Sequence, residues 1–113
     1  MNIEEILQLA KTALEDLKAT DITEIDVRGK TSMTDFMLIA SGTSSRHVKS
    51  IAHSVVEKFK ELGKKPFGVE GESDAEWVLV DMGDVVVHVM QAQIRDFYQL
   101  EKLWTMDRDA DSE

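Results

Sequence analysis

The clearest pattern along the chain is the recurrence of apolar residues every three or four positions in two stretches. In residues 2–19 the apolar positions that share a helical face are Ile3, Ile6, Leu7, Ala10, Ala13, Leu14 and Leu17. In residues 44–62 they are Val48, Ile51, Ala52, Val55, Val56, Phe59 and Leu62. This spacing predicts two amphipathic helices, each with one face on a core. Gly63 is the residue type expected just past the end of the second helix.

Three shorter stretches have the pattern of strands. Residues 23–28 alternate between apolar and polar side chains, which predicts a half-buried strand. Residues 36–40 are continuously apolar, which favours a central strand buried on both faces. Pro66, the only proline, opens a predicted short strand at 66–70, where a first-residue proline is tolerated. We expect the crossover from 36–40 through the second helix to 66–70 to be parallel and right-handed.

Residues 77–90, WVLVDMGDVVVHVM, predict two strands joined by a tight turn at Gly83-Asp84. A two-residue turn places Trp77 opposite Met90. Side chains then alternate between two faces of the hairpin. One face is uniformly apolar and contains Val78, Val80, Met82, Val85, Val87 and Val89. The other is mixed and contains Trp77, Leu79, Asp81, Val86, His88 and Met90.

The mixed face has two interpretations. Large apolar groups beside a carboxylate and an imidazole are typical of a partner-binding surface. Alternatively, a helix covers this face and Asp81 lies at its wet edge. Both interpretations depend on the register, because a three-residue turn would exchange the relative faces of the two strands and separate Trp77 from Met90.

The last part of the chain predicts a short helix at 92–99, followed by an apolar pair, Leu103-Trp104, that packs on the domain. Residues 107–113 form an acidic tail that we expect to be disordered, beyond a single domain of residues 1–106. The predicted order of elements is αββαβββα. This order predicts an α/β (α+β) fold with a mixed five-stranded sheet flanked by helices.

Composition narrows the classes of function. A chain of 113 residues forms one domain, has no apolar run of membrane-spanning length, and begins with acids unlike a signal peptide. It has no cysteine, which excludes disulfides and thiol catalysis. A net charge of −9 is unlike the basic footprint of a nucleic-acid-binding protein. We therefore expect no direct nucleic-acid binding as the main activity, and a basic protein as the kind of partner that is attracted.

Each candidate for chemistry has a simpler explanation. The stretch Ser41–His47 joins a buried strand to a helix, where an anion such as phosphate can bind, but helix capping alone explains its hydroxyls. Asp81 and Asp84 could hold a metal, although aspartates in turns usually form local hydrogen bonds. The histidines lack metal-binding spacing, and a hydrogen-bonding role at an interface is favoured for His88. We assign no catalytic residue, metal or cofactor.

Acidic residues gather in sequence around the hairpin: Glu70, Glu72, Asp74, Glu76, Asp81 and Asp84. They could form nothing more than a solvated loop. Beside Trp77, Leu79 and Met90, however, they favour an acidic rim around an apolar centre, which suits a basic protein surface.

The stretches DVRGKTSMTDFMLIASGTSSRHV, PFGVEGESDAEWVLVDMGDVVVHVM and RDFYQLEKLW resemble the signatures of the ribosomal silencing factor family, RsfS, also called Iojap-like. The resemblance covers about residues 2–104. Met82 stands where many members carry an aromatic residue, and the predicted register turns it toward the core. The resemblance implies a nucleotidyltransferase-like fold without the paired catalytic acids, and a protein that is not an enzyme.

The resemblance also implies a function. Family members bind the large ribosomal subunit through ribosomal protein L-fourteen, block joining of the small subunit sterically, and so repress translation when nutrients are scarce. Bacterial members are cytoplasmic, and without a transit peptide we expect the same here. The implied partner surface combines the hairpin and the last helix with nearby acids: Trp77, Leu79, Asp81, His88, Met90, Tyr98, Glu70, Glu72 and Asp84.

Two alternatives stay open. An enzyme that handles nucleotides could use residues 41–47 together with Asp81 and Asp84. An exposed apolar patch would also allow the free protein to form a homodimer.

Overall fold

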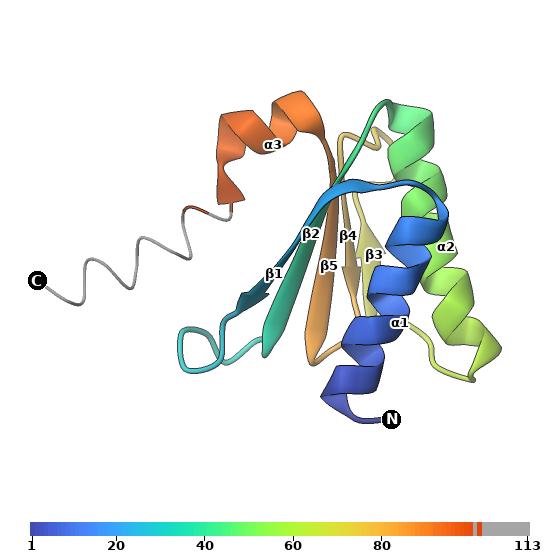
Figure 1. Ribbon diagram of the computed structural model, residues 1–113, viewed down its shortest axis with the longest axis vertical. Coiled ribbons are helices and arrows are strands. Elements are labelled where there is room, and N and C mark those ends of the chain that lie inside the picture. The colour runs from blue at the N-terminus through green and yellow to red at the C-terminus, as the bar shows by residue number, and fades with distance from the viewer. Residues whose placement is uncertain (101, 103–113) are drawn as a thin grey trace, which may run out of the picture.

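The computed structural model describes residues 1–100 and residue 102 (Figure 1). Its helices are α1 (Ile3–Asp16), α2 (Ser45–Glu61) and α3 (Ala92–Tyr98). Its strands are β1 (Thr20–Asp26), β2 (Phe36–Gly42), β3 (Gly68–Glu70), β4 (Trp77–Asp81) and β5 (Val85–Gln91). The predicted order αββαβββα is confirmed. The predictions for Leu103, Trp104 and the tail at 107–113 lie outside the described residues.

The predicted mixed five-stranded sheet is confirmed, and its strand order is β1-β2-β5-β4-β3. β2 and β5 are parallel, and the other neighbouring strands are antiparallel. β3 therefore runs in the same direction as β2, but the hairpin β4–β5 lies between them. The central place beside β2 belongs to β5, which is largely buried on both faces, whereas the three-residue β3 stays at the edge.

The boundary between the first helix and the first strand differs from the prediction. α1 ends at Asp16 and β1 begins at Thr20, each three residues before the predicted positions 19 and 23. Lys18 has a φ of 61°, and the amide of Ala19 donates to the carbonyl of Leu14 at 3.0 Å, which closes the helix. Apolar side chains continue through this turn, so their periodicity could not mark the end of the helix.

The hydrophobic core lies between the sheet and the pair of helices α1 and α2, which cover the same face (Figure 1). The uniformly apolar hairpin face points into this core: Val78, Val80, Val85, Val87 and Val89 are fully buried, and Met82 packs at the edge. α3 lies on the other side of the sheet, against the ends of β2 and β5 (Figure 1). Among the described residues, no other helix covers that second face.

The hairpin has the predicted register. Trp77 pairs with Met90, and the amide of Met82 donates to the carbonyl of Val85 across the turn at 2.9 Å. Gly83 has a φ of 88°, a conformation that glycine adopts without steric cost. The two-residue turn therefore divides the side chains between two faces as the sequence predicts.

Candidate functional site: an aromatic surface on the sheet

The mixed face of the hairpin is partly exposed and partly buried. Trp77, Leu79 and Asp81 on β4 are half-buried. On β5, His88 is only 4% exposed and Met90 is fully buried. Two of the side chains predicted to bind a partner therefore lie beneath the surface, where they can support the exposed groups but cannot contact a partner in this conformation.

The apolar surface continues from the hairpin onto β1 and β2. Met37 is the partner of Val86 across the parallel pair, and Ile25 is the partner of Met37, so the three side chains share the second face of the sheet. All three are half-buried. Sequence reasoning did not include Ile25 and Met37 in the site, because strand alternation does not tell which strands become neighbours.

Trp77 is held in place by His88. The indole Nε1 of Trp77 donates a hydrogen bond to Nδ1 of His88 at 3.0 Å, and the two ring centroids lie 5.9 Å apart. Burial lowers the pKa of His88 from 6.5 to about 4, so the imidazole is neutral near neutral pH. Because Nδ1 accepts, the ring proton is on Nε2, which is buried without a hydrogen-bond partner among the described residues.

α3 adds two aromatic side chains next to Trp77. The ring of Tyr98 lies 5.1 Å from that of Trp77 at a tilt of 51°, and Phe97 contacts Tyr98 edge-on at 5.1 Å. Tyr98 is 55% exposed and Phe97 78% exposed. A contiguous group of exposed aromatic rings is typical of a protein-binding surface. Phe97 was not among the predicted site residues, and its place beside Tyr98 was the only signal for it in the sequence.

Arg95 fixes α3 to the sheet. Its guanidinium is buried and donates to the carbonyl of Asp21 at 2.6 Å, to Thr23 Oγ1 at 2.9 Å and to Ser41 Oγ at 3.0 Å. These acceptors belong to β1 and β2, so the Arg95 side chain connects α3 to both strands. Sequence reasoning missed this role, because nothing near Arg95 in the sequence marks it as buried.

The predicted acids do not form one rim. Glu70 is opposite Leu79 in the β3–β4 pair and shares its face, and Asp81 lies two residues further along β4. Asp81 also accepts a hydrogen bond from the amide of Gly83 at 2.8 Å, so it helps to fix the turn. Glu72 instead lines a hollow beside α2, and Asp84 lies in the turn at the far end of the hairpin.

We call the exposed part of this face the Trp77 surface. It consists of Trp77, Leu79, Phe97 and Tyr98, with Glu70 and Asp81 on the same face of the β3–β4 pair. Its apolar centre and carboxylates match the chemistry expected for a basic protein partner.

The candidate anion loop is occupied by capping contacts. Ser44 Oγ accepts from the amide of His47, as predicted for a helix cap. The amide of Thr43 donates to Nδ1 of His47 at 2.9 Å, so the proton on Nε2 points to the carbonyl of Leu17 at 2.6 Å. A methyl group added at Gly42 would lie 2.8 Å from the side chain of Val48, so the strand end and the helix are already in close contact.

Among residues 1–100 and 102, no three His, Asp or Glu side chains converge in a way that could hold a metal ion. None of the described helices combines the length and apolar character needed to span a bilayer.

Comparisons with known proteins agree with one another. The family model described as "Ribosomal silencing factor during starvation" matches residues 1–113. A Chromobacterium violaceum protein named ribosomal silencing factor RsfS is 52% identical over 104 residues, which are 92% of this chain and 85% of that protein. The Haemophilus influenzae protein of the same name is 46% identical over 99 residues, which are 88% of this chain and 97% of that protein.

A solved structure supports the fold. A crystal structure of a Chromobacterium violaceum protein, 51% identical, superposes with a TM-score of 0.91 and covers 93% of this chain and 88% of that one. The predicted α+β fold with a mixed sheet is thereby confirmed. The expected likeness to nucleotidyltransferases is not tested by this match and stays a prediction.

Proposed function

The chain belongs to the ribosomal silencing factor family, and from this premise we propose that it binds the large ribosomal subunit through ribosomal protein L-fourteen. The bound protein would occupy the surface on which the small subunit docks. It would thereby block subunit joining and repress translation during starvation. The relatives carry the name of a regulatory factor, and we propose a steric mechanism that needs no catalysis. We place this activity in the cytoplasm, by analogy with the bacterial relatives.

The observation that carries the proposal is the exposed aromatic group on a sheet face that, within residues 1–100 and 102, is covered by α3 alone. Trp77 is half-buried, yet its orientation is set by His88 below it and by Tyr98 beside it. A ring that is fixed before binding loses little conformational entropy when a partner covers it. Such rings are the usual centres of binding energy at protein interfaces.

Charge supports a basic partner. The chain carries a net charge of −9, which attracts a basic surface over distances of about one Debye length, roughly 8 Å at physiological salt. Glu70 is opposite Leu79, and Asp81 lies at the other end of β4 from Trp77. Both carboxylates would pair with Lys or Arg side chains of the partner. Glu72 and Asp84 lie outside the Trp77 surface, and we propose that they add only to this longer-range attraction.

The residues of the site then divide into two groups. Trp77, Leu79 and Tyr98 would contact the partner, whereas His88 and Met90 would support them from below. A rigid domain held by this surface would exclude the small subunit by its volume alone.

Cosedimentation with purified large subunits, with joining of small subunits measured in parallel, tests the proposal. Trp77→Ala should weaken binding by about 2 kcal/mol or more and restore joining. Leu62→Ala is the matched control, because Leu62 is 56% exposed at the end of α2, away from the Trp77 surface. Equal binding by wild type and Trp77→Ala would show that another surface binds the ribosome.

The charge of the surface is better tested at Glu70 than at Asp81. Asp81→Lys would also remove the acceptor for the Gly83 amide and so disturb the turn. Glu70→Lys reverses a charge on an exposed side chain at the sheet edge, and we expect slower association with large subunits at low salt. An unchanged association rate would argue against a basic partner at this edge.

Nucleotide handling has less support, because Ser44 is engaged in capping and Asp81 in the turn. Calorimetry with ATP and Mg²⁺ separates the two functions: saturable nucleotide binding without cosedimentation would favour the alternative. The Trp77 surface would also be available for self-association of the free protein, which sedimentation at several concentrations would detect.

A further inference from the structure

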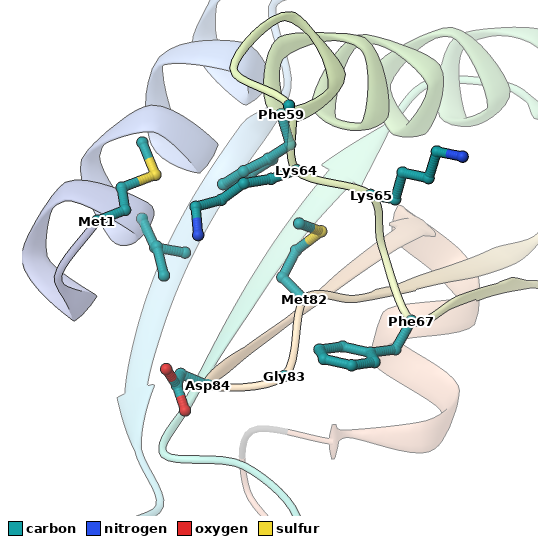
Figure 2. Close-up of a pocket in the computed structure, with 10 residues that line it drawn as sticks. Met1, Phe59, Lys64, Lys65, Phe67, Met82, Gly83 and Asp84 are labelled. Carbon is teal, nitrogen blue, oxygen red and sulfur yellow. The ribbon is translucent and has the colours of Figure 1, made fainter.

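The hairpin turn lies at the opposite end of the sheet from α3 and forms one wall of a cavity of about 460 Å³ (Figures 1 and 2). The cavity is lined by Phe59 of α2 and Ile6 of α1, both buried, and by the apolar side chains of Met82 and Phe67. Small-molecule sites typically have volumes of roughly 300–1,000 Å³ and apolar walls with a few polar groups. This cavity has a volume in that range and a lining that combines apolar and charged groups, and it shares no residue with the Trp77 surface.

The end of α2 fixes Lys64 beside the cavity. Gly63 has a φ of 74°, its amide donates to the carbonyl of Lys60, and the amide of Lys64 donates to the carbonyl of Phe59, each at 2.9 Å. This is the helix end predicted from the glycine, and it places Lys64 at the lining of the cavity. Both Lys64 and Lys65 line the cavity. Figure 2 shows the Lys64 side chain extending across it, whereas the side chain of Lys65 is directed away.

Lys64 has an unneutralised charge at this position. No carboxylate among the described residues forms an ion pair with it. Asp84 is the acid that lines the cavity, on the side of the hairpin turn. An ammonium group beside apolar walls is suited to a ligand with one negative charge, since the Asp84 carboxylate repels a second one.

Phe67 contributes an aromatic ring to the lining of the cavity. Phe67 is 82% exposed, yet its ring lies so close to Gly83 that a methyl group added there would be 2.7 Å from it. The amide of Phe67 donates to the carbonyl of Asp81 at 2.8 Å, which fixes the backbone. An aromatic ring exposed to water at the mouth of a cavity is typical of a binding site.

We propose that this cavity binds a small amphipathic anion, in which a single carboxylate is attached to an apolar body. The carboxylate accepts from the ammonium group of Lys64, and a charge-assisted bond of this kind is stronger than a neutral one. The apolar body packs against Phe67, which is exposed, and Met82, which is half-buried. Binding here does not depend on the ribosome, so the proposal stands or fails independently of the Trp77 surface.

Decanoate is the probe, and decanol is its control because it has the same chain without the charge. Calorimetry on the full chain, with amide chemical shifts measured by NMR, should show saturable decanoate binding with the largest shifts at Phe59, Lys64 and Met82. Decanol should bind at least about tenfold more weakly. Equal binding of the two, no saturable binding, or shifts confined to residues around Trp77 would overturn the proposal.

Lys64→Gln and Lys65→Gln are a matched pair, because the two lysines are exposed neighbours and only the first extends over the cavity. Lys64→Gln should weaken decanoate binding about tenfold, and Lys65→Gln less than about twofold. Asp84→Asn should strengthen binding, since it removes a repelling charge. Equal losses in the two lysine variants, or weaker binding by Asp84→Asn, would overturn the assignment of Lys64. Melting temperatures of the variants show that each is folded.

Discussion

The indole Nε1 of Trp77 donates a hydrogen bond to the buried Nδ1 of His88, 3.0 Å away on the neighbouring strand. The two residues are diagonal neighbours, because Trp77 is paired with Met90 and His88 with Leu79. This bond sets the orientation of the largest ring on the Trp77 surface. It also explains why the mixed face contains an imidazole: a neutral histidine can accept from the indole while it remains buried.

Trp77→Phe keeps an aromatic ring but removes the indole donor. The buried Nδ1 of His88 then loses its partner, which costs about 1–3 kcal/mol in the free energy of unfolding. Urea denaturation measures this loss. Because the ring contact with Tyr98 is retained, the variant should bind large subunits better than Trp77→Ala does. A Trp77→Phe protein as stable as wild type would show that the hydrogen bond adds nothing to stability.

Acid should destabilise the folded protein through His88. Burial lowers its pKa from 6.5 to about 4, so below about pH 6.5 the unfolded chain takes up a proton that the folded chain does not. The contribution of His88 to the free energy of unfolding is therefore fully present above about pH 6.5. It falls as the pH drops toward about 4 and changes little below that value. The loss is on the order of 2 kcal/mol by about pH 4.5.

His88→Gln isolates this effect from the titration of carboxylates. Glutamine is neutral at every pH and still offers an oxygen to the indole of Trp77. Unfolding free energies of the two proteins, measured at several pH values, should converge as the pH falls from about 7 to 4.5. Parallel profiles would mean that His88 takes up its proton equally in the folded and unfolded chains.

Arg95→Met should release α3 from the sheet. The change removes the donors to Asp21, Thr23 and Ser41 and leaves their oxygens without this partner, which we expect to cost about 2–4 kcal/mol. Hydrogen exchange should show faster exchange in α3, and ribosome binding should weaken because Tyr98 is no longer held against Trp77. Arg46→Met, at an exposed arginine on α2, is the control. Similar exchange rates in both variants would contradict this role.

The sequence was informative where local periodicity decides the structure and less so where the topology decides it. The hairpin register followed from alternation and from Gly83, and the end of α2 from Gly63. The burial of His88 and Met90 did not follow, because it depends on α3 and on the strands next to β5. The separation of Asp84 from Trp77 did not follow either. Trp77 begins β4, whereas Asp84 lies in the turn beyond the other end of that strand. The role of Arg95 rests on partners more than fifty positions away.

Gly71 supports Trp77 through the backbone rather than through a side chain. It has a φ of 88°, and a methyl group added there would lie 2.1 Å from the carbonyl oxygen of Trp77. Gly71→Ala must therefore move the start of β4, and we expect it to destabilise the protein by about 3 kcal/mol or more and to weaken ribosome binding. Gly29→Ala is the matched control, because Gly29 has a similar φ of 81° with nothing within 4 Å of the added carbon. Gly29→Ala should lose only the roughly 1–2 kcal/mol that a left-handed backbone conformation costs. Equal losses of stability in the two variants would exclude the contact with Trp77 as the cause.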